Sequence, residues 1–491
     1  MGITIVGLGP GNGRLLTREA WQTLTTVETI YLRTKRHPAV DDLPNGAVLH
    51  SFDHLYDSAE KFGDVYDQIV AELLQLGQSE DVVYAVPGHP FVGEATVTRL
   101  VAAAKKINLP MRIVAGLSFV EPALTAVGID ALDGLQIFDA LVLSEFLYPP
   151  VNSNAPLLLA QVYNRLVAGE VKLLLTAVYP DEHLVTLIHA AGENNQTIEQ
   201  LHLYEIDRSP QIDHLTSLYV PPLSQASTLP ALAETVAVLR GPNGCPWDQE
   251  QTPQSMRSGF LEEAYEVVTA LDNDDVDNLR EELGDLLYHL LFQAQIASER
   301  GDFTLTEVIA GIETKLKRRH PHVWGDWEVA DTAEVLRNWE LLKMREKVDK
   351  PDSILDNIPS ALPALARSQK IQDKVSEVNF DWPDISGVWN KLQEEIDELK
   401  DAKSSEEKMS ELGDILFVLV NLGRWLKLDA ETALREANSC FSKRFNLVEQ
   451  MVETRKLDWN DLDLPVIDLL WREAKELLAN DDAPVKVEGI S

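Results

Sequence analysis

Two stretches of this sequence carry acidic residues at a spacing that could hold a metal ion. In the first stretch the pairs are Glu263 with Glu266 and Glu282 with Asp285. Side chains three residues apart lie on one face of a helix, so two such helices packed antiparallel would bring four carboxylates together. Like charges in contact repel and raise each other's pKa. A divalent cation removes that cost, and Mg²⁺ and Mn²⁺ prefer carboxylate oxygens as ligands.

The same pattern occurs a second time further along the chain. The second set of acidic residues consists of Glu395, Glu398, Glu411 and Asp414. Each set is followed by a basic pair and then by a tryptophan. A repeat period above 100 residues indicates duplicated domains rather than a solenoid. A single acid pair is usually only a solvated helix face, but the doubling and the repetition favour two metal sites.

A glycine lies between the acids of the second helix in each set, at Gly284 and at Gly413. Glycine inside a helix costs ~1 kcal/mol relative to alanine. A close approach of the two helices at the metal would explain that cost. We therefore expect the helices of each set to come closest at these glycines.

Further residues near each set could handle a phosphate chain. Glu262 and Glu394 are adjacent to the expected ligands and could position or deprotonate water. The expected phosphate or base contacts are Lys317, Arg318, Arg319, Asn438, Lys443, Arg444 and Trp471. Cationic side chains bind phosphate oxygens, but basic residues at a helix end are often only solvated. A tryptophan such as Trp339 or Trp471 is more often part of a core than stacked on a base.

The two halves differ at some of these positions. Asn438 aligns with Glu313, and Cys440 aligns with Lys315. Each half has therefore kept a polar group that the other lacks. The sequence leaves open which of the two halves is active.

The acidic residues lie in a region whose pattern predicts helices. Long amphipathic stretches such as Gly259–Ala270 and Val276–Ala297 follow a proline-rich segment at 221–230. Residues before that segment alternate short β-branched runs with helical stretches such as Val65–Leu76 and Ala95–Lys106, which is typical of an α/β domain. The runs expected as strands are Ile3–Val6, Val82–Val86, Met111–Val114, Leu141–Leu143, Val171–Thr176 and Leu184–Ile188.

The composition limits the classes of partner. The chain has 43 Lys and Arg against 79 Asp and Glu, and its formal net charge is −36. Binding to a nucleic-acid polymer or to an anionic membrane surface requires basic residues, so we expect neither partner. Two cysteines cannot form a disulfide framework, and no apolar run reaches the ~18 residues of a membrane span. We therefore expect a soluble, cytoplasmic protein.

A glycine-rich loop, Gly7–Gly13, follows the first expected strand. Glycines allow the backbone to approach a ligand closely. A dinucleotide-binding loop would need its third glycine at position 12 or 14, but these residues are Asn12 and Arg14. The loop alone leaves open both a plain strand–helix turn and a ligand-binding loop.

Motifs around the acidic sets are similar to those of a known family. Asn243–Asp248 and Arg318–Val323 flank the first set, while Val378–Trp382 and Ala437–Phe445 flank the second. Over about residues 230 to 478 the chain resembles the MazG family of nucleoside triphosphate pyrophosphohydrolases. The resemblance implies an all-α fold, usually dimeric, in which the two acidic sets hold Mg²⁺. It also implies attack of water near the α/β-phosphate bridge, which gives a nucleoside monophosphate and pyrophosphate.

Three motifs in the first 222 residues carry a second resemblance. They are Ile3–Thr17, Val86–Gly93 and Ala115–Phe119, in this order. They resemble the tetrapyrrole (corrin/porphyrin) methylase family, which implies two α/β lobes with S-adenosylmethionine in the cleft between them. The matching cofactor positions are Pro10, Pro87, Gly88, His89, Val92, Ser118, Phe119, Val162 and Gly192. His89 replaces the Asp that is usual in this family, and this departure speaks against a tetrapyrrole as the methyl acceptor.

The sequence therefore predicts a multi-domain chain. A two-lobed α/β methylase-like domain is expected at 1–222, and two all-α MazG-like domains at 231–348 and 360–480. The expected function is Mg²⁺- or Mn²⁺-dependent pyrophosphohydrolysis of nucleoside triphosphates, including non-standard ones, by a homodimer formed through the helical domains. The alternative is an S-adenosylmethionine-dependent methyltransferase whose helical half serves dimerisation or regulation. A third interpretation makes the N-terminal half a nucleotide sensor or scaffold.

Overall fold

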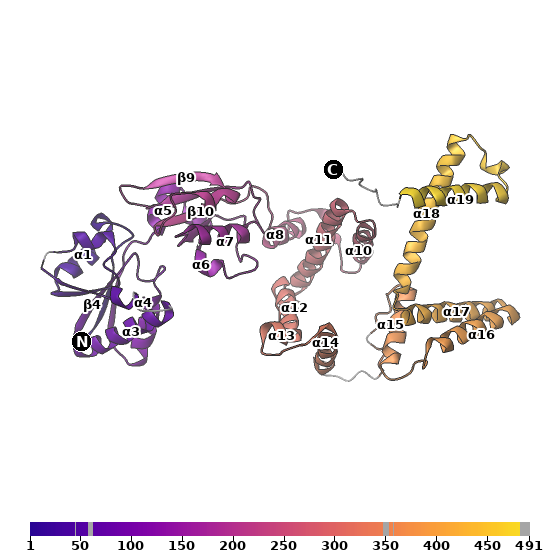
Figure 1. The fold of residues 1–491 in the computed structure, drawn as a ribbon, viewed down its shortest axis with the longest axis horizontal. Coiled ribbons are helices and arrows are strands. Elements are labelled where there is room, and N and C mark those ends of the chain that lie inside the picture. Colours follow the sequence, from indigo (N-terminus) through magenta and orange to yellow (C-terminus); the bar gives the residue numbers. More distant parts are fainter. Residues whose placement is uncertain (45, 57–61, 347–352, 357, 482–491) are drawn as a thin grey trace, which may run out of the picture. The chain divides into compact units, whose positions relative to one another are not determined.

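The structure is a computed structural model that describes residues 1–491 except 45, 57–61, 347–352, 357 and 482–491 (Figure 1). The chain divides into two units, Met1–Thr314 and Lys315–Ser491. The predicted domain limits at 222, 231, 360 and 480 stay predictions, and the limit at 348 lies outside the described residues.

The first lobe of the N-terminal part is a parallel sheet with the strand order β3-β2-β4-β1-β5. Its strands are β1 Gly2–Gly7, β2 Thr29–Leu32, β3 Val48–Ser51, β4 Asp81–Val86 and β5 Met111–Val114. The helices between them are α1 Arg18–Thr25, α2 Asp53–Tyr56, α3 Phe62–Ser79 and α4 Ala95–Lys106. The central strand β1 is buried on both sides, with Ile5 in one hydrophobic cluster and Val6 in another. Burial on both faces is typical of parallel sheets.

The second lobe is a mixed sheet with the strand order β6-β7-β10-β8-β9. Its strands are β6 Gln136–Asp139, β7 Leu157–Ala160, β8 Leu184–His189, β9 Thr197–His202 and β10 Thr216–Val220. The helices of this lobe are α5 Val120–Val127, α6 Ala140–Leu143 and α7 Arg165–Leu175. The two lobes confirm the predicted α/β architecture of the N-terminal part.

Two of the expected strands are wrong. Leu141–Leu143 lies in α6, and Val171–Thr176 overlaps the end of α7. A short apolar run cannot be distinguished from a buried helix by periodicity alone. The capping residues decide here, because Asp139 and Asn164 accept hydrogen bonds from the first turns of α6 and α7. The other four expected strands are confirmed as β1, β4, β5 and β8.

The rest of the chain is helical, as predicted. Its helices are α8 Leu229–Arg240, α9 Pro246–Glu250, α10 Arg257–Asp272, α11 Val276–Arg300, α12 Leu305–Arg319, α13 Pro321–Trp324, α14 Thr332–Glu346, α15 Ala364–Ser376, α16 Ile385–Asp401, α17 Ser405–Trp425, α18 Ala430–Thr454 and α19 Leu464–Asp481. None of the helices in the described ranges is both long and apolar enough to cross a membrane.

The duplication is visible as two helical hairpins, α10–α11 and α16–α17 (Figure 1). In each hairpin a short turn reverses the chain, and the second helix starts with a side-chain cap. Asp275 caps α11, and Ser404 forms a capping box with Glu407 at the start of α17. A third helix completes each group, since α8 packs on α11 and α15 packs on α17. The hairpins carry the two predicted acidic sets.

Candidate functional site

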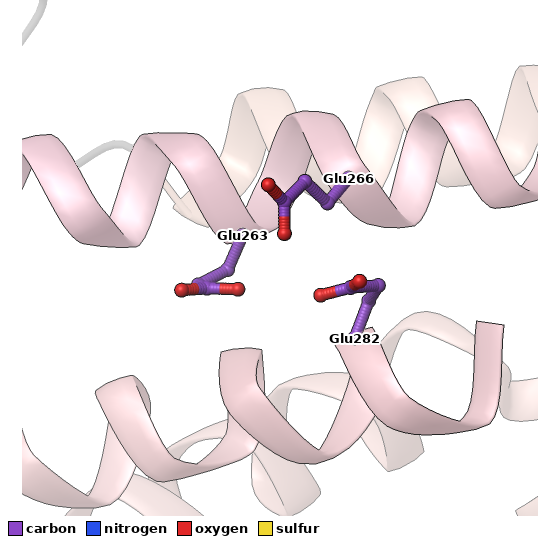
Figure 2. Close-up of side chains that lie close together, drawn as sticks. All are labelled: Glu263, Glu266 and Glu282. Atoms are coloured by element: carbon purple, nitrogen blue, oxygen red, sulfur yellow. The ribbon is translucent and has the colours of Figure 1, made fainter. Parts of the chain in front are cut away.

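Three carboxylates of the first acidic set converge between α10 and α11. Glu263 and Glu266 extend from α10 and Glu282 extends from α11, with their carboxylates pointing toward one another (Figure 2). One oxygen from each of the three lies within 4.8 Å of the others. The i, i+3 spacing in α10 and the antiparallel hairpin bring three of the four predicted carboxylates together. Asp285 is not part of the trio, although its charge acts on Glu282.

The electrostatics of this cluster fit a cation site. Burial, together with the carboxylates of Glu266, Glu263 and Asp285, raises the pKa of Glu282 to about 7. The charged form of Glu282 is thus disfavoured as long as nothing positive offsets its neighbours. A divalent cation would offset them, and three carboxylates are oxygen donors of the kind that Mg²⁺ binds.

Cation binding at the first cluster is expected to strengthen as the pH rises through about 7. Glu282 must lose its proton to act as a ligand, and its pKa is raised to about 7. Below that pH, each unit of decrease should weaken Mn²⁺ binding by up to about tenfold, because one proton competes with the metal. Calorimetric titration with Mn²⁺ at pH 6 and pH 8 checks this. Glu282→Gln removes the competing proton, so its residual binding should depend less on pH; an unchanged dependence would contradict the assignment.

A histidine lies against the first cluster. His289 is buried on α11, and its Nε2 lies 3.9 Å from Oε1 of Glu263. The position facing it on α10 is Gly259, where a Cβ atom would come within 2.9 Å of the His289 ring. The glycine therefore makes room for the histidine. Sequence reasoning missed His289, because a single histidine on a helix gives no signal by itself.

The second acidic set forms a matching cluster. One oxygen each from Glu395, Glu411 and Asp414 lies within 4.8 Å of the others, between α16 and α17. Burial and the neighbouring carboxylates raise the pKa of Glu411. Glu398 is not part of this trio, although its charge is among those that act on Glu411.

The second cluster differs from the first in that a lysine side chain contacts its carboxylates. Nζ of Lys391 lies 2.7 Å from Oε1 of Glu394 and 2.7 Å from Oε1 of Glu395. Lys391 occupies the position that matches Gly259 in α10, at the same spacing before the acid pair. The two predicted water-handling residues are therefore in different environments: Glu394 is paired with this lysine, whereas Glu262 is exposed.

The expected close approach of the helices at Gly284 and Gly413 is wrong. A Cβ atom built at either glycine would meet no other heavy atom within 4 Å. Both residues face open space beside the clusters, so packing within the chain does not require glycine at these positions.

Two of the predicted phosphate contacts, Arg319 and Arg444, each lie beside a tryptophan. The guanidinium of Arg319 lies 5.9 Å from the ring centre of Trp339, and Nζ of Lys343 lies 4.1 Å from it. Arg444 lies 5.9 Å from the ring centre of Trp471 in the same way. The other predicted contacts are exposed side chains on α12 and α18: Lys317, Arg318, Asn438 and Lys443.

In the second half the predicted phosphate and base contacts lie on the helix pair α18–α19. The helix α18 packs mainly against α19, with smaller contacts to α15 and α17. Trp471 packs on Phe441 at 4.9 Å between ring centres. Trp471 is partly buried against the hydrophobic cluster of α18 and α19, with Arg444 5.9 Å from its ring centre.

The glycine-rich loop packs tightly in the N-terminal part. Gly9 and Gly88 exchange backbone hydrogen bonds of 3.2 and 2.8 Å. A Cβ atom at Gly7 or Gly116 would lie within 2.6 or 2.5 Å of the Gly88 carbonyl oxygen. Three chain segments thus meet at a distance that only glycine permits.

A cavity of about 210 Å³ opens beside this junction. It is lined by segments of both lobes, including five of the predicted cofactor positions: Pro10, Pro87, Gly88, Val92 and Phe119. The other four positions lie outside its lining. His89 accepts a hydrogen bond from the Phe91 amide, Ser118 bonds to Glu121, Val162 is in the hydrophobic core, and Gly192 has a φ of 81°.

Sequence reasoning missed a buried ion pair in the wall of this cavity. Arg33 donates a hydrogen bond of 2.9 Å to Glu94 and another of 3.1 Å to the Tyr56 hydroxyl. Burial lowers the pKa of Arg33, but Glu94, Tyr56 and Tyr84 together raise it by more, so the guanidinium stays charged. The two residues lie 61 positions apart in the sequence and belong to no motif, so no local pattern could have found them.

Comparison with known proteins gives two family matches. Residues 2–207 match the model of tetrapyrrole (corrin/porphyrin) methylases, and residues 251–324 match the model of the MazG nucleotide pyrophosphohydrolase domain. The second match spans the α10–α11 hairpin with its carboxylates.

Individual relatives cover the chain to different extents. The uncharacterized protein YabN of Bacillus subtilis is 40% identical over 483 residues, which is 96% of this chain and 98% of that protein. The nucleoside triphosphate pyrophosphohydrolase/pyrophosphatase MazG of Thermotoga maritima is 42% identical over 50% of this chain and 94% of its own length. The nucleoside triphosphate pyrophosphohydrolase of Escherichia coli K12 is 45% identical over 48% of this chain and 93% of its own length. The chain therefore belongs to the MazG family of nucleoside triphosphate pyrophosphohydrolases and carries a tetrapyrrole methylase domain before its helical part.

Proposed function

We propose that this protein hydrolyses nucleoside triphosphates to nucleoside monophosphates and pyrophosphate, with Mg²⁺ or Mn²⁺ held by the carboxylate clusters. The observation that carries the proposal is the convergence of three carboxylates in each hairpin. The names of the Thermotoga and E. coli relatives support the same reaction. The strongly acidic chain, with a net charge of −36, needs such a cation between its carboxylates and a phosphate chain.

The roles of the residues follow from their positions. Glu263, Glu266 and Glu282 would hold the metal in the first half, and Glu395, Glu411 and Asp414 in the second. When bound, the metal supplies an activated water and neutralises charge that develops on the phosphates. Asp285 and Glu398 would complete the two sets.

Two further groups of residues would act on water and phosphate. Glu262 and Glu394, each adjacent to a ligand, would orient the attacking water and take its proton. Cationic side chains of α12 and α18 would bind the phosphates. They are Lys317, Arg318, Arg319, Lys443 and Arg444.

The products and the metal requirement test this function. Incubation with a panel of nucleoside triphosphates and Mg²⁺ is expected to release pyrophosphate and monophosphate together, without a diphosphate intermediate. Excess EDTA should abolish the reaction, and Mn²⁺ should replace Mg²⁺ without any need for zinc. Orthophosphate and nucleoside diphosphate as first products, or full turnover in EDTA, would overturn the proposal.

We also propose that the helical part forms a homodimer. The helix α11 carries three half-exposed leucines at helical spacing, and α17 repeats them. They are Leu283, Leu287 and Leu290, and Leu412, Leu416 and Leu419. Apolar rows of this kind are typical of helix–helix association. Light scattering on the full chain tests the proposal, and a monomer at micromolar concentration would contradict it.

A second candidate activity is favoured by the cavity between the N-terminal lobes. Five predicted cofactor positions line it, and Gly7, Gly88 and Gly116 let three backbone segments approach one another there. We propose that it binds S-adenosylmethionine. Calorimetric titration with S-adenosylmethionine tests this binding. The absence of any detectable heat of binding would refute it.

A further inference from the structure

Each carboxylate cluster has a basic side chain against the same glutamate. Glu263 and Glu395 occupy matching positions in the two hairpins, four residues after Gly259 and Lys391. In the first half Nε2 of His289 lies 3.9 Å from Oε1 of Glu263, which is beyond hydrogen-bonding distance. In the second half Nζ of Lys391 lies 2.7 Å from Oε1 of Glu395. Of the two glutamates, only Glu395 thus has a basic partner at hydrogen-bonding distance among the described residues.

The basic residue comes from opposite helices in the two hairpins. His289 extends from α11, and Gly259 on α10 leaves room for its ring. Lys391 extends from α16, and α17 has the buried, apolar Val418 at the position that matches His289. This reciprocal exchange keeps one basic side chain beside the glutamate. It replaces an imidazole by an ammonium, which is charged at neutral pH.

Lys391 is an internal counter-ion of the second cluster. It lies four residues before Glu395, so both side chains are on one face of α16, and its Nζ also contacts Glu394 at 2.7 Å. Glu395 is 4% exposed, and one of its oxygens lies within 4.8 Å of oxygens of Glu411 and Asp414. A buried carboxylate among like charges requires an opposite charge. The lysine supplies this charge without a metal ion.

The ammonium opposes a metal ion in two ways. It occupies the Glu395 oxygen that a metal ion would bind, and it repels the incoming cation. A cation bound to that oxygen at about 2.1 Å would lie within about 5 Å of Nζ. Repulsion between a divalent and a unit charge at this separation weakens binding by about tenfold or more, even in the dielectric of water. The second cluster should therefore bind a free cation more weakly than the first.

The first cluster has no such competitor in the part of the chain that the structure describes. Glu263, Glu266 and Glu282 form no ion pair with a lysine or an arginine there. Their three carboxylates point toward one another (Figure 2). Their mutual repulsion favours the binding of a cation from solution.

We infer that Lys391 sets the cation demand of the second half, so that the two clusters fill in sequence. The first cluster binds a divalent cation tightly, and the second fills only at a free cation concentration about tenfold higher or more. This inference rests on the metal-binding part of the proposed function and extends it to the order of filling. Turnover at the second cluster would then require a concentration of Mg²⁺ or Mn²⁺ at which the first cluster is already occupied.

Titration of the full chain with Mn²⁺ at pH 8, without nucleotide, tests the order of filling. Electron paramagnetic resonance of the free ion is expected to show two classes of site, whose dissociation constants differ by about tenfold or more. Glu282→Gln should weaken the tight class alone, and Glu411→Gln should weaken the weak class alone. These two variants assign each class to its hairpin.

Substitutions of the lysine test its role directly. Lys391→Met removes the ammonium and keeps the length of the side chain, so it should tighten the weak class by about tenfold. Lys391→Arg retains the charge and should leave the weak class weak. Lys400→Met is the matched control, because Lys400 lies on the same helix and pairs with Asp397 at 2.8 Å, outside the cluster. It removes the same charge from α16 and should leave both classes unchanged.

A further variant and a second measurement keep the test independent of stability. Lys391→Gln retains an amide donor for Glu395 without the charge, and it should tighten the weak class as Lys391→Met does. Thermal unfolding provides the second measurement. Mn²⁺ should raise the unfolding temperature of Lys391→Met by more than that of the wild type, because a ligand stabilises the folded state according to its affinity.

Three results would overturn the inference. They are two classes of equal affinity in the wild type, a weak class that is unaltered in both Lys391→Met and Lys391→Gln, and equal tightening by Lys400→Met. If the classes respond as expected but no triphosphate yields pyrophosphate, the order of filling stands and the proposed function fails.

Discussion

Glu411→Gln is expected to lower pyrophosphate release by about a hundredfold or more, while the matching Glu282→Gln leaves most of the activity. Loss of a residue that only supports a metal ligand already costs 10–100-fold, and Glu411 is one of the three converging carboxylates. The variant keeps the volume and loses one charge. We expect turnover at the second cluster, because a cavity of about 380 Å³ lined by α15, α17 and residues 379–382 lies beside it. Steady-state release of pyrophosphate from the preferred triphosphate measures the effect.

The paired design separates three arrangements of the duplicated sites. If the activities lost in Glu282→Gln and in Glu411→Gln are similar and add up to the wild-type activity, the two sites are independent and of comparable turnover. Two inactive single variants would mean that the halves act as one unit. An inactive Glu282→Gln with a normal Glu411→Gln would place turnover in the first half and contradict the expected result.

Gly116→Ala is expected to destabilise the N-terminal part by about 3 kcal/mol or more and to abolish binding of S-adenosylmethionine. The added Cβ atom would lie 2.5 Å from the Gly88 oxygen and 2.8 Å from the Gly7 carbonyl carbon. These are backbone atoms, so relief requires the three segments to move apart, and overpacking of this kind costs 1–3 kcal/mol, occasionally more. Thermal unfolding and calorimetric titration with the cofactor measure the two effects.

Gly169→Ala is the matched control for this substitution. Gly169 lies inside α7, and its added Cβ atom would come no closer than 3.8 Å to the nearest atom. Alanine in a helix interior is favoured over glycine by about 1 kcal/mol, so stability should stay equal or rise. An unaltered unfolding temperature in Gly116→Ala would show that the close junction of the three segments contributes little.

The convergence of the carboxylates was predictable because its signal is local. Glu263 and Glu266 are one helical turn apart, and a hairpin with a capped second helix brings Glu282 opposite them. The glycine loop was likewise visible as a motif. Asp285 was predicted as a ligand because it is three residues from Glu282, the same spacing as Glu263 and Glu266. Spacing alone could not exclude it, because the rotation of α11 about its axis decides which of its side chains face α10.

Other parts could not be predicted because their signal is not local. Leu141–Leu143 and Val171–Thr176 have apolar runs that suit a strand, and the caps Asp139 and Asn164 make them helical. Arg33 and Glu94 form an ion pair, and Gln372 and Asn421 line one cavity, although only the folded chain brings these residues together. Gly284 and Gly413 suggested close packing of the helices. The sequence around a glycine does not show whether another chain segment lies against it.

In the first half the guanidinium of Arg240 lies 5.1 Å from the ring centre of the fully buried Phe292, and this packing has a consequence for how the chain tolerates mutation. A packed core resists substitution because a smaller side chain leaves a void and a larger one does not fit. The matching positions of the second hairpin region, Gln372 and Asn421, line a cavity, so substitution there disturbs less packing. Among homologues with this architecture, the residues matching Arg240 and Phe292 should vary together and keep their combined volume. Those matching Gln372 and Asn421 should not show this joint variation, because they line a cavity rather than fill a core.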